Sequence, residues 1–209
     1  MSFFRKLKRY FKKEIQKLAA EDYADIVFKN NVTFWSNNLH AGKDCVFSRT
    51  ERMEFGKNIR FGEGTKIYAI TLFDSPQGEQ IFTPTLIVGN NVQITSSLQL
   101  YAMKEIIIED NVLFAANVFV SDGFHGYSRT DIPYKDQHYS ELKPIRICES
   151  SWIGQNVVIL PGVTIGKFSI IGANSVVTKS IPDYSIAAGL PARVIKKWDF
   201  ENSRWIEVK

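Results

Sequence analysis

The residue best suited to proton transfer in this chain is His125, in the stretch NVFVSDGFHGY. A neutral imidazole can take a proton from a hydroxyl group near pH 7, so a histidine beside a bound substrate is a natural general base. Taken alone, a loop histidine bonded to the backbone explains the residue more simply. Asp122, three residues earlier, also has two interpretations. It either orients His125 or contacts a substrate hydroxyl, or it caps its own turn.

The other residues with ligand or nucleophile chemistry do not form a recognisable site. Cys45 and Cys148 show no disulfide framework and no metal motif, which fits a reduced protein of the cytoplasm. Only Arg146 places a cation near Cys148 in sequence, so we interpret Cys148 as structural. We assign His40 to a structural or surface role and His138 to the surface. Zinc catalysis needs three protein ligands and an open position, and the histidine spacing offers no such set.

A six-residue repeat follows this histidine. From Ile147 to Pro182 the chain reads ICESSW, IGQNVV, ILPGVT, IGKFSI, IGANSV, VTKSIP, so every first position is aliphatic. The second and fifth positions are mostly small, polar or β-branched. A helix or a simple alternating strand does not have a period of six, whereas a short fixed repeat of this kind is typical of a β-helix. Each hexad predicts one short strand and one corner, and three hexads close a triangular coil.

The same repeat precedes His125 and stops there. From Val88 it reads VGNNVQ, ITSSLQ, LYAMKE and, after two extra isoleucines, IEDNVL, FAANVF, VSDGFH. It resumes only at about Ile147, so His125 begins the longest interruption, a protruding loop predicted over 126–146. We expect its ring to point off the prism towards a neighbouring subunit. A shorter interruption over 73–87 contains two prolines and a glycine, which mark a second loop that leaves the coil.

The stretch IGQNVVILPGVTIGKFSIIGANSVVTKSIPDYSIAAGLPARVI resembles the C-terminal half of the hexapeptide-repeat acyltransferases. Within that family it is most similar to the branch of maltose, galactoside and polysaccharide O-acetyltransferases. The specific motifs run from about Val88 to Ile195, and the N-terminal part matches only in its hexad rhythm. The resemblance implies an all-β fold, a left-handed parallel β-helix, a homotrimer and acetyl-CoA as the acyl donor. The left hand comes from the resemblance, because ordinary parallel crossovers are right-handed.

The resemblance also makes His125 the general base of a direct transfer. Acceptor and acetyl-CoA would bind together at the seam between two prisms, with backbone N–H groups stabilising the oxyanion. Orientation of two bound reactants supplies much of the rate, so no covalent acyl-enzyme and no metal is needed. On the acceptor side we name Asp122, Tyr127 and Thr95. Thr95 stands where the galactoside branch has an asparagine, and Gly123 and Phe124 replace a second histidine, so the identity of the sugar stays open.

Seven positions on the C-terminal coils match donor-binding positions of the family. Trp152 would flank the acyl group, although a large residue that closes the loop explains it almost as well. The positions that meet the pantetheine arm are Gln155, Ala173 and Thr178, and those near the nucleotide phosphates are Lys179, Arg193 and Lys196. Cations are physically required beside phosphate groups.

The formal charge of +4 is unevenly placed, because residues 1–18 carry +6 and the rest of the chain carries −2. Apolar residues at spacings of three and four predict a basic amphipathic helix over 1–20. That helix either packs on the first coil or a neighbouring subunit, or lies on an anionic membrane surface. The body lacks a basic stripe interleaved with aromatics, which argues against nucleic-acid binding. Without a secretory signal or spanning run, we expect a cytoplasmic protein, peripheral at the inner membrane face in the second case.

The predicted organisation is therefore a helix over 1–20, a β-helix over 21–195 and a C-terminal tail over 196–209. In the N-terminal coils the inward column is irregular, and we set it at Phe28, Phe34, His40, Val46, Phe55, Phe61 and Ile67. Aromatic residues on such a column are typical of terminal repeats. In the tail, we expect Trp198 and Trp205 to pack across the trimer.

Three functions stay open at this point. The first is O-acetylation of a sugar of a surface polysaccharide or its precursor. The second keeps the fold but acetylates the amine of an amino sugar nucleotide, or an antibiotic, because the same base serves either group. The third is a β-helical scaffold without turnover, and the presence of His125, Lys179 and Arg193 together argues against it.

Overall fold

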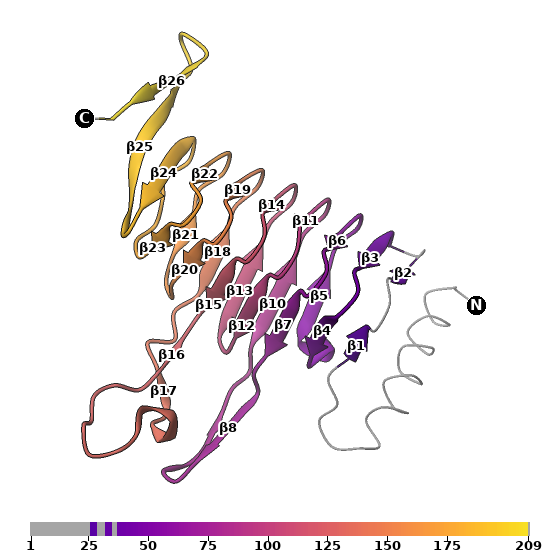
Figure 1. The fold of residues 1–209 in the computed structure, drawn as a ribbon, viewed down its shortest axis with the longest axis vertical. Coiled ribbons are helices and arrows are strands. Elements are labelled where there is room, and N and C mark those ends of the chain that lie inside the picture. Colours follow the sequence, from indigo (N-terminus) through magenta and orange to yellow (C-terminus); the bar gives the residue numbers. More distant parts are fainter. Residues whose placement is uncertain (1–25, 29–31, 35–36, 209) are drawn as a thin grey trace.

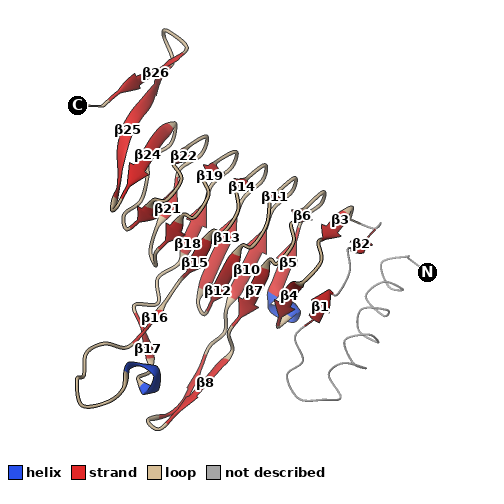
Figure 2. Ribbon diagram, viewed as in Figure 1, coloured by secondary structure: helices blue, strands red, loops and turns tan. Residues whose placement is uncertain are grey.

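The computed structural model describes residues 26–28, 32–34 and 37–208 of the 209-residue chain. Short strands and tight corners wind into a coil whose turns stack along one axis (Figure 1). Each full turn gives one strand to each of three sheets, which are the faces of a prism and are called sheets A, B and C. Neighbouring turns pair in parallel (Figure 2), which confirms the predicted all-β coil of parallel strands. The predicted helix over 1–20 lies outside the described residues.

The strands of the prism belong to these three sheets. Sheet A contains β1 (Ile26–Phe28), β4 (Cys45–Ser48), β7 (Lys66–Ala69), β12 (Gln99–Ala102), β15 (Phe119–Ser121), β20 (Val158–Ile159) and β23 (Val176–Val177). Sheet B contains β2 (Val32–Phe34), β3 (Leu39–Ala41), β6 (Arg60–Phe61), β11 (Gln93–Ile94), β14 (Leu113–Phe114), β19 (Trp152–Ile153), β22 (Ile170–Ile171), β24 (Ser185–Gly189), β25 (Ala192–Asp199) and β26 (Arg204–Glu207). Sheet C contains β5 (Met53–Phe55), β10 (Thr85–Val88), β13 (Glu105–Ile108), β18 (Ile145–Ile147) and β21 (Thr164–Ile165).

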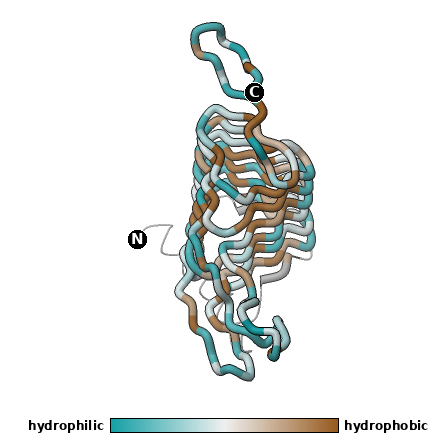
Figure 3. Tube along the Cα trace, turned by 90° about the vertical axis from the view of Figure 1, so that its left-hand side faces the viewer, coloured by the Kyte–Doolittle hydropathy of each residue, from teal (hydrophilic) through white to brown (hydrophobic). Residues whose placement is uncertain are grey.

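The core is the set of first-position side chains, stacked inside the prism. The predicted column is confirmed, since the six aliphatic residues from Ile147 to Val177 are all fully buried. Figure 3 shows hydrophobic positions recurring turn after turn along the coil. Burying one such side chain is worth about 1.5–3 kcal/mol, so the repeat itself supplies the stability of the prism. The fifth position is small because it turns the corner: Ser151, Ser169 and Ser175 are buried, and each hydroxyl donates to a backbone carbonyl.

In the first coils the predicted inward column is wrong at two places. His40 and Val46 are only half-buried, whereas their neighbours Ala41 and Phe47 are buried in the core. Successive side chains of a strand point to opposite faces, so an error of one residue exchanges inside for outside. Farther along, Phe61 and Ile67 are buried as predicted.

The prism has two regular edges and one irregular edge. At the B–C edge, asparagines in the left-handed conformation form a ladder of side-chain amides, from Asn58 to Asn91 (2.9 Å) and from Asn91 to Asn111 (3.0 Å). At the A–B edge, Asn117, Asn156 and Asn174 form a second ladder. Asparagine tolerates this backbone conformation better than most residues do, which explains why it recurs at the corners.

The irregular A–C edge carries both interruptions of the repeat. After β7 the chain leaves as the hairpin of β8 (Leu72–Ser75) and β9 (Gly78–Ile81), and it returns at β10. After β15 it leaves again through β16 (Phe124–His125), the 3-10 turn η2 (Tyr134–Asp136) and β17 (Tyr139–Ser140). A further 3-10 turn, η1 (Thr50–Arg52), lies between β4 and β5. The coil resumes at β18, so the second loop ends at residue 144 and not at 146 as predicted.

The C-terminal tail does not begin at the predicted boundary. Strand β25 runs from Ala192 to Asp199 and crosses the expected boundary at 195, and β26 pairs with it antiparallel. Trp198 and Trp205 pack edge to face within this hairpin, with ring centroids 5.3 Å apart. Among the residues that the structure describes, no helix is long and apolar enough to cross a membrane.

Candidate active site

His125 lies on the A–C edge, on a strand that leaves the prism. Its strand β16 pairs antiparallel with β17, so that His125 faces Tyr139 and Phe124 faces Ser140. The N–H of Gly126 donates to the carbonyl of His138 at 2.8 Å and extends this pairing. The imidazole is therefore carried by a short ribbon outside the core, as expected from the point where the repeat stops.

The imidazole is held by aromatic rings. It stacks on the ring of Tyr139, with centroids 4.2 Å apart and planes inclined by 30°. Phe73, from β8, meets it edge to face at 5.3 Å and also contacts the Tyr139 ring at 5.0 Å. Nδ1 is buried and has no hydrogen-bond partner among the described residues. Nε2 is therefore the ring nitrogen that can meet a substrate hydroxyl.

The β8–β9 hairpin and the second loop hold each other directly. The side-chain amide of Gln80 donates to the Tyr139 carbonyl at 2.9 Å and accepts from the Tyr139 N–H at 2.7 Å. Nε2 of His138 lies 3.0 Å from the carbonyl oxygen of Gly78. His138, which the sequence assigned to the surface, thus belongs to the contact between the two loops.

Asp122 has a role that neither sequence-based interpretation describes. Its carboxylate is fully buried and accepts from the backbone N–H groups of Met103, Lys104 and Glu105, at 2.7–2.8 Å. Those residues form the A–C corner of the preceding turn, so Asp122 caps a neighbouring corner. Burial raises the pKa of the Asp122 carboxyl, and the three backbone donors offset this only in part. With its oxygens enclosed, the carboxylate has no surface on which to receive an acceptor.

The remainder of the second loop is organised by Gln137. This buried side chain donates to the carbonyls of Arg129 and Ile132 and accepts from the Arg129 N–H. Tyr127 is exposed, and its hydroxyl donates to Glu141 at 3.3 Å. It lies in the same loop as His125, two residues farther along the chain.

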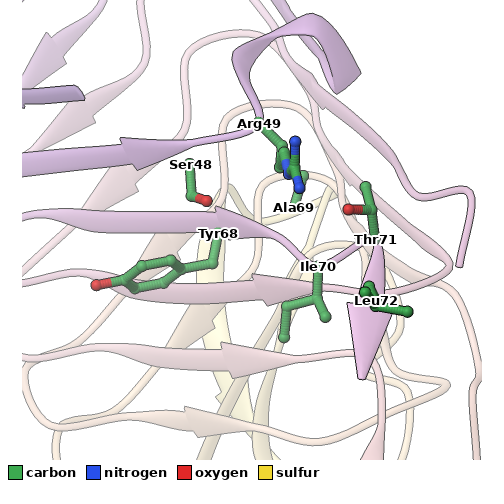
Figure 4. Close-up of a pocket in the computed structure, with 7 residues that line it drawn as sticks. All are labelled: Ser48, Arg49, Tyr68, Ala69, Ile70, Thr71 and Leu72. Atoms are coloured by element: carbon green, nitrogen blue, oxygen red, sulfur yellow. The ribbon is translucent and has the colours of Figure 1, made fainter. Parts of the chain in front are cut away.

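A cavity of about 300 Å³ lies on the other side of the β8–β9 hairpin. Figure 4 shows its lining residues, Ser48, Arg49, Tyr68, Ala69, Ile70, Thr71 and Leu72. Leu72 borders the cavity whereas the next residue, Phe73, contacts His125. Adjacent side chains of a strand point to opposite faces, so the hairpin separates this cavity from the imidazole.

The proposed donor residues occupy different parts of the prism. Gln155 and Ala173 lie on the A–B edge, as does Thr95, each at the corner that follows a sheet B strand. Thr178 and Lys179 are exposed on the A–C edge, the edge of His125. Trp152 is 47% exposed on the outer face of sheet B, and Arg193 and Lys196 lie on β25 of the same sheet. Within one prism, Thr95 and the A–B residues are thus separated from His125 by the width of sheet A.

Neither cysteine has the environment of a nucleophile. Burial raises the pKa of the Cys45 thiol and of the half-buried Cys148 thiol, which favours the protonated form of each. In the described part of the chain, no group of three or more histidine, cysteine, aspartate or glutamate side chains could hold a metal ion.

Comparison with known proteins explains the repeat. Residues 144–179 match the family model described as bacterial transferase hexapeptide (six repeats). WbbJ of Escherichia coli, whose name assigns it to O-acetyl transfer in lipopolysaccharide biosynthesis, is 30% identical over 77% of this chain and 80% of its own. The chain belongs to the hexapeptide-repeat acetyltransferases. The galactoside O-acetyltransferase of Escherichia coli is 43% identical over 110 residues, which is 53% of each chain.

A solved structure shows the same fold along most of the chain. It is a variant of AntD, an N-acyltransferase from Bacillus cereus, in complex with dTDP and coenzyme A. The match covers 91% of both chains with a TM-score of 0.54 and 19% identity, so it shows the fold alone.

In this acetyltransferase, the sequence failed to identify the partners of His125 in the first loop. Phe73 and Gln80 lie in the segment 73–87, which was recognised only as an interruption. The one usable signal was the turn: Pro76 and Gln77 separate the two strands, and Gly78 follows with a φ of +104°. Proline is favoured at the second position of a four-residue turn and glycine at the fourth. Nothing in the sequence alone indicated that this hairpin reaches His125.

Proposed function

We propose that this protein is an acetyl-CoA-dependent O-acetyltransferase that modifies a sugar hydroxyl of a surface polysaccharide or its precursor. The observation that carries the proposal is the position of His125, which stands at the edge of a hexapeptide prism with one ring nitrogen enclosed and the other available. The relationship to WbbJ supports transfer to an oxygen and a polysaccharide acceptor.

In the proposed reaction, Nε2 of His125 takes the proton of the acceptor hydroxyl as that oxygen attacks the thioester carbonyl. The new ester bond forms, the carbon–sulfur bond breaks, and the imidazolium returns its proton to the departing thiolate of coenzyme A. The histidine ends each cycle neutral, and no acyl group is attached to the protein. Such general-base assistance typically contributes about 10²–10⁴-fold in rate.

The donor residues fit acetyl-CoA in chemical type. Lys179, Arg193 and Lys196 supply cations for phosphate groups, and Gln155 and Thr178 supply hydrogen-bonding groups for the pantetheine amides. Ala173 leaves room for the arm, and the exposed ring of Trp152 offers apolar surface for the acetyl end. We assign these roles to a groove between two copies, because one prism distributes the residues over two edges and one face.

This arrangement requires an oligomer, which we propose to be a homotrimer of left-handed coils. We further propose a cytoplasmic protein that contacts the inner face of the membrane through the basic segment 1–18, which lies outside the described residues. Binding to vesicles that contain anionic lipid should disappear when residues 1–18 are deleted. Equal binding by the two proteins would exclude the membrane contact.

The experiment that tests the activity measures free-thiol release from acetyl-CoA with a panel of acceptors. The panel contains mono- and oligosaccharides, nucleotide-linked amino sugars and antibiotics, and a His125→Ala protein is assayed in parallel. Release with a saccharide, lower by about 10²–10⁴-fold in the variant, is the expected result. Release only with an amine would replace O-acetylation by N-acetylation. Failure to bind acetyl-CoA would exclude the transferase and favour a scaffold.

A further inference from the structure

We propose that the β8–β9 hairpin is the positioning element of His125 and that it acts through Phe73 and Gln80. The inference rests on the proposed function, because it assumes that His125 is the general base. It goes further by assigning a role to a segment outside the hexapeptide repeat. Neither Phe73 nor Gln80 touches the reacting atoms of the proposed transfer, so both are positioning residues.

Among the described residues, packing alone holds the imidazole. A histidine base is usually oriented by a hydrogen bond from its second nitrogen to a carboxylate or carbonyl. Here Nδ1 is buried without such a partner among the described residues, and Asp122 is engaged elsewhere. The rings of Tyr139 and Phe73 are therefore what fixes the plane of the imidazole.

The hairpin holds Tyr139 as well. The Gln80 amide makes a donor and an acceptor bond to the same backbone residue, at 2.9 and 2.7 Å, as a neighbouring strand would. Phe73 contacts the Tyr139 ring at 5.0 Å, and Phe82 does so at 5.9 Å. Tyr139 is thus fixed at both its backbone and its ring by residues of one segment.

The hairpin presents the Phe73 ring and the Gln80 amide from one face. Phe73 and Gln80 are directly opposite each other in the β8–β9 register. Cross-strand partners project from the same face of a two-stranded ribbon. The next pair, Asp74 and Glu79, lies on the other face and is exposed. This one cross-strand pair therefore supplies both contacts: the Phe73 ring packs on His125, and the Gln80 amide bonds to Tyr139.

Loss of either group should lower the rate of the chemical step without affecting the donor. A displacement of about 1 Å in a reacting group can cost about 100-fold in rate. We expect Gln80→Ala and Phe73→Ala to lower kcat by about 10- to 100-fold. The KM for acetyl-CoA should change by less than about twofold, because the donor residues lie on other turns of the coil. Phe73→Tyr keeps the ring and should restore most of the activity.

The matched controls are Glu79→Ala and Asp74→Ala, which alter the same hairpin on its opposite face. Their kcat should equal that of the parent protein, and the thermal midpoint of these two control variants should be unchanged. If Glu79→Ala lowered kcat as much as Gln80→Ala, the hairpin would act through its general fold, and the specific assignment would fall.

A double-substitution cycle separates positioning from an independent effect. In a His125→Ala background, Gln80→Ala should cost less than about threefold, because there is no longer a base to position. A full additional loss in that background would overturn the proposal. Should His125→Ala itself retain full activity, the proposed function would lose its base. Should it lose activity while Gln80→Ala and Phe73→Ala do not, only the positioning role would fail.

Discussion

The imidazole of His125 lies parallel, within 30°, to the phenol ring of Tyr139, and the two residues are also direct partners in the β16–β17 ribbon. Backbone pairing and ring stacking thus fix the same two residues relative to each other. Because cross-strand neighbours keep their separation even where a loop is long, this pairing gives His125 a defined position outside the prism.

Tyr139 should contribute its ring and not its hydroxyl. Burial and the nearby Tyr101 raise the pKa of Tyr139 above the ordinary value, so the phenol stays neutral through any practical assay range. Tyr139→Phe should keep kcat within about twofold, whereas Tyr139→Ala should lower it by about 10- to 100-fold. Steady-state kinetics from pH 6 to 9 check this. Equal losses in the two variants would mean that the hydroxyl takes part in the reaction.

Asp122 should prove to be a stability residue. Asp122→Ala leaves three backbone N–H groups of the preceding corner without this acceptor, and the loss at the buried Met103 N–H alone costs about 1–3 kcal/mol. Denaturant unfolding should therefore show a loss of at least that size. Asp74→Ala, at an exposed position of the β8–β9 hairpin, serves as a control and should change the free energy of unfolding by less than about 0.5 kcal/mol.

The pH dependence of that stability follows from the same carboxyl. The fold raises the pKa of the Asp122 carboxyl, so the folded protein favours its protonated form. The stability that this carboxyl contributes to the fold is therefore fully present below its ordinary pKa, and it decreases as the pH rises through the pKa in the folded protein. We compare the free energies of unfolding of the parent protein and of Asp122→Asn. The parent value minus the variant value should decrease as the pH is raised from 3 to 7. A difference that rises over this interval would mean that the backbone donors outweigh burial.

The sequence predicted the prism well because the repeat is a local signal. Each inward aliphatic residue is followed by a corner and, six residues later, by the next inward residue, and Ile147 to Val177 kept this register without interruption. At His40 and Val46 the six-residue repeat was less regular. The predicted inward column was one residue out of register there, so both residues were assigned to the inner face by mistake. The N-terminal strands β1 and β2 pair antiparallel with β4 and β3, whereas neighbouring turns of the coil pair in parallel.

The site was only partly predictable, because it depends on contacts between two insertions. His125 could be found from the place where the hexads stop. Its contact with Phe73 joins residues that are far apart in sequence, and no periodicity connects them. Asp122 shows the same limit, since the corner that it caps belongs to the preceding turn. Contacts between turns depend on the stacking of the coil, which a hexad does not encode.

The asparagine ladder gives a test of the corners. Asn91 has a φ of +56° and joins Asn58 to Asn111 through its amide. Asn91→Ala loses both side-chain hydrogen bonds. It also places alanine in the left-handed conformation, which costs a residue with a Cβ roughly 1–2 kcal/mol. Asn91→Gly loses the same bonds without that strain, so it should be less destabilising by about 1 kcal/mol. Chemical denaturation of the two variants measures this difference in the free energy of unfolding. Equal losses of stability would mean that the whole effect comes from the side-chain hydrogen bonds of Asn91.

The outer face of sheet B should be covered in the proposed trimer. Leu113, Trp152 and Ile170 are aligned in register there, and Leu113 and Trp152 are 39% and 47% exposed in the single chain. A row of large apolar side chains on a sheet face is typical of an interaction surface. Leu113→Glu should therefore yield a monomer in light scattering and lose thiol release. Gln93→Glu, one turn earlier in the same column, adds the same charge on an exposed polar position and should remain trimeric. A trimer in the Leu113→Glu protein would show that the subunits meet through another face.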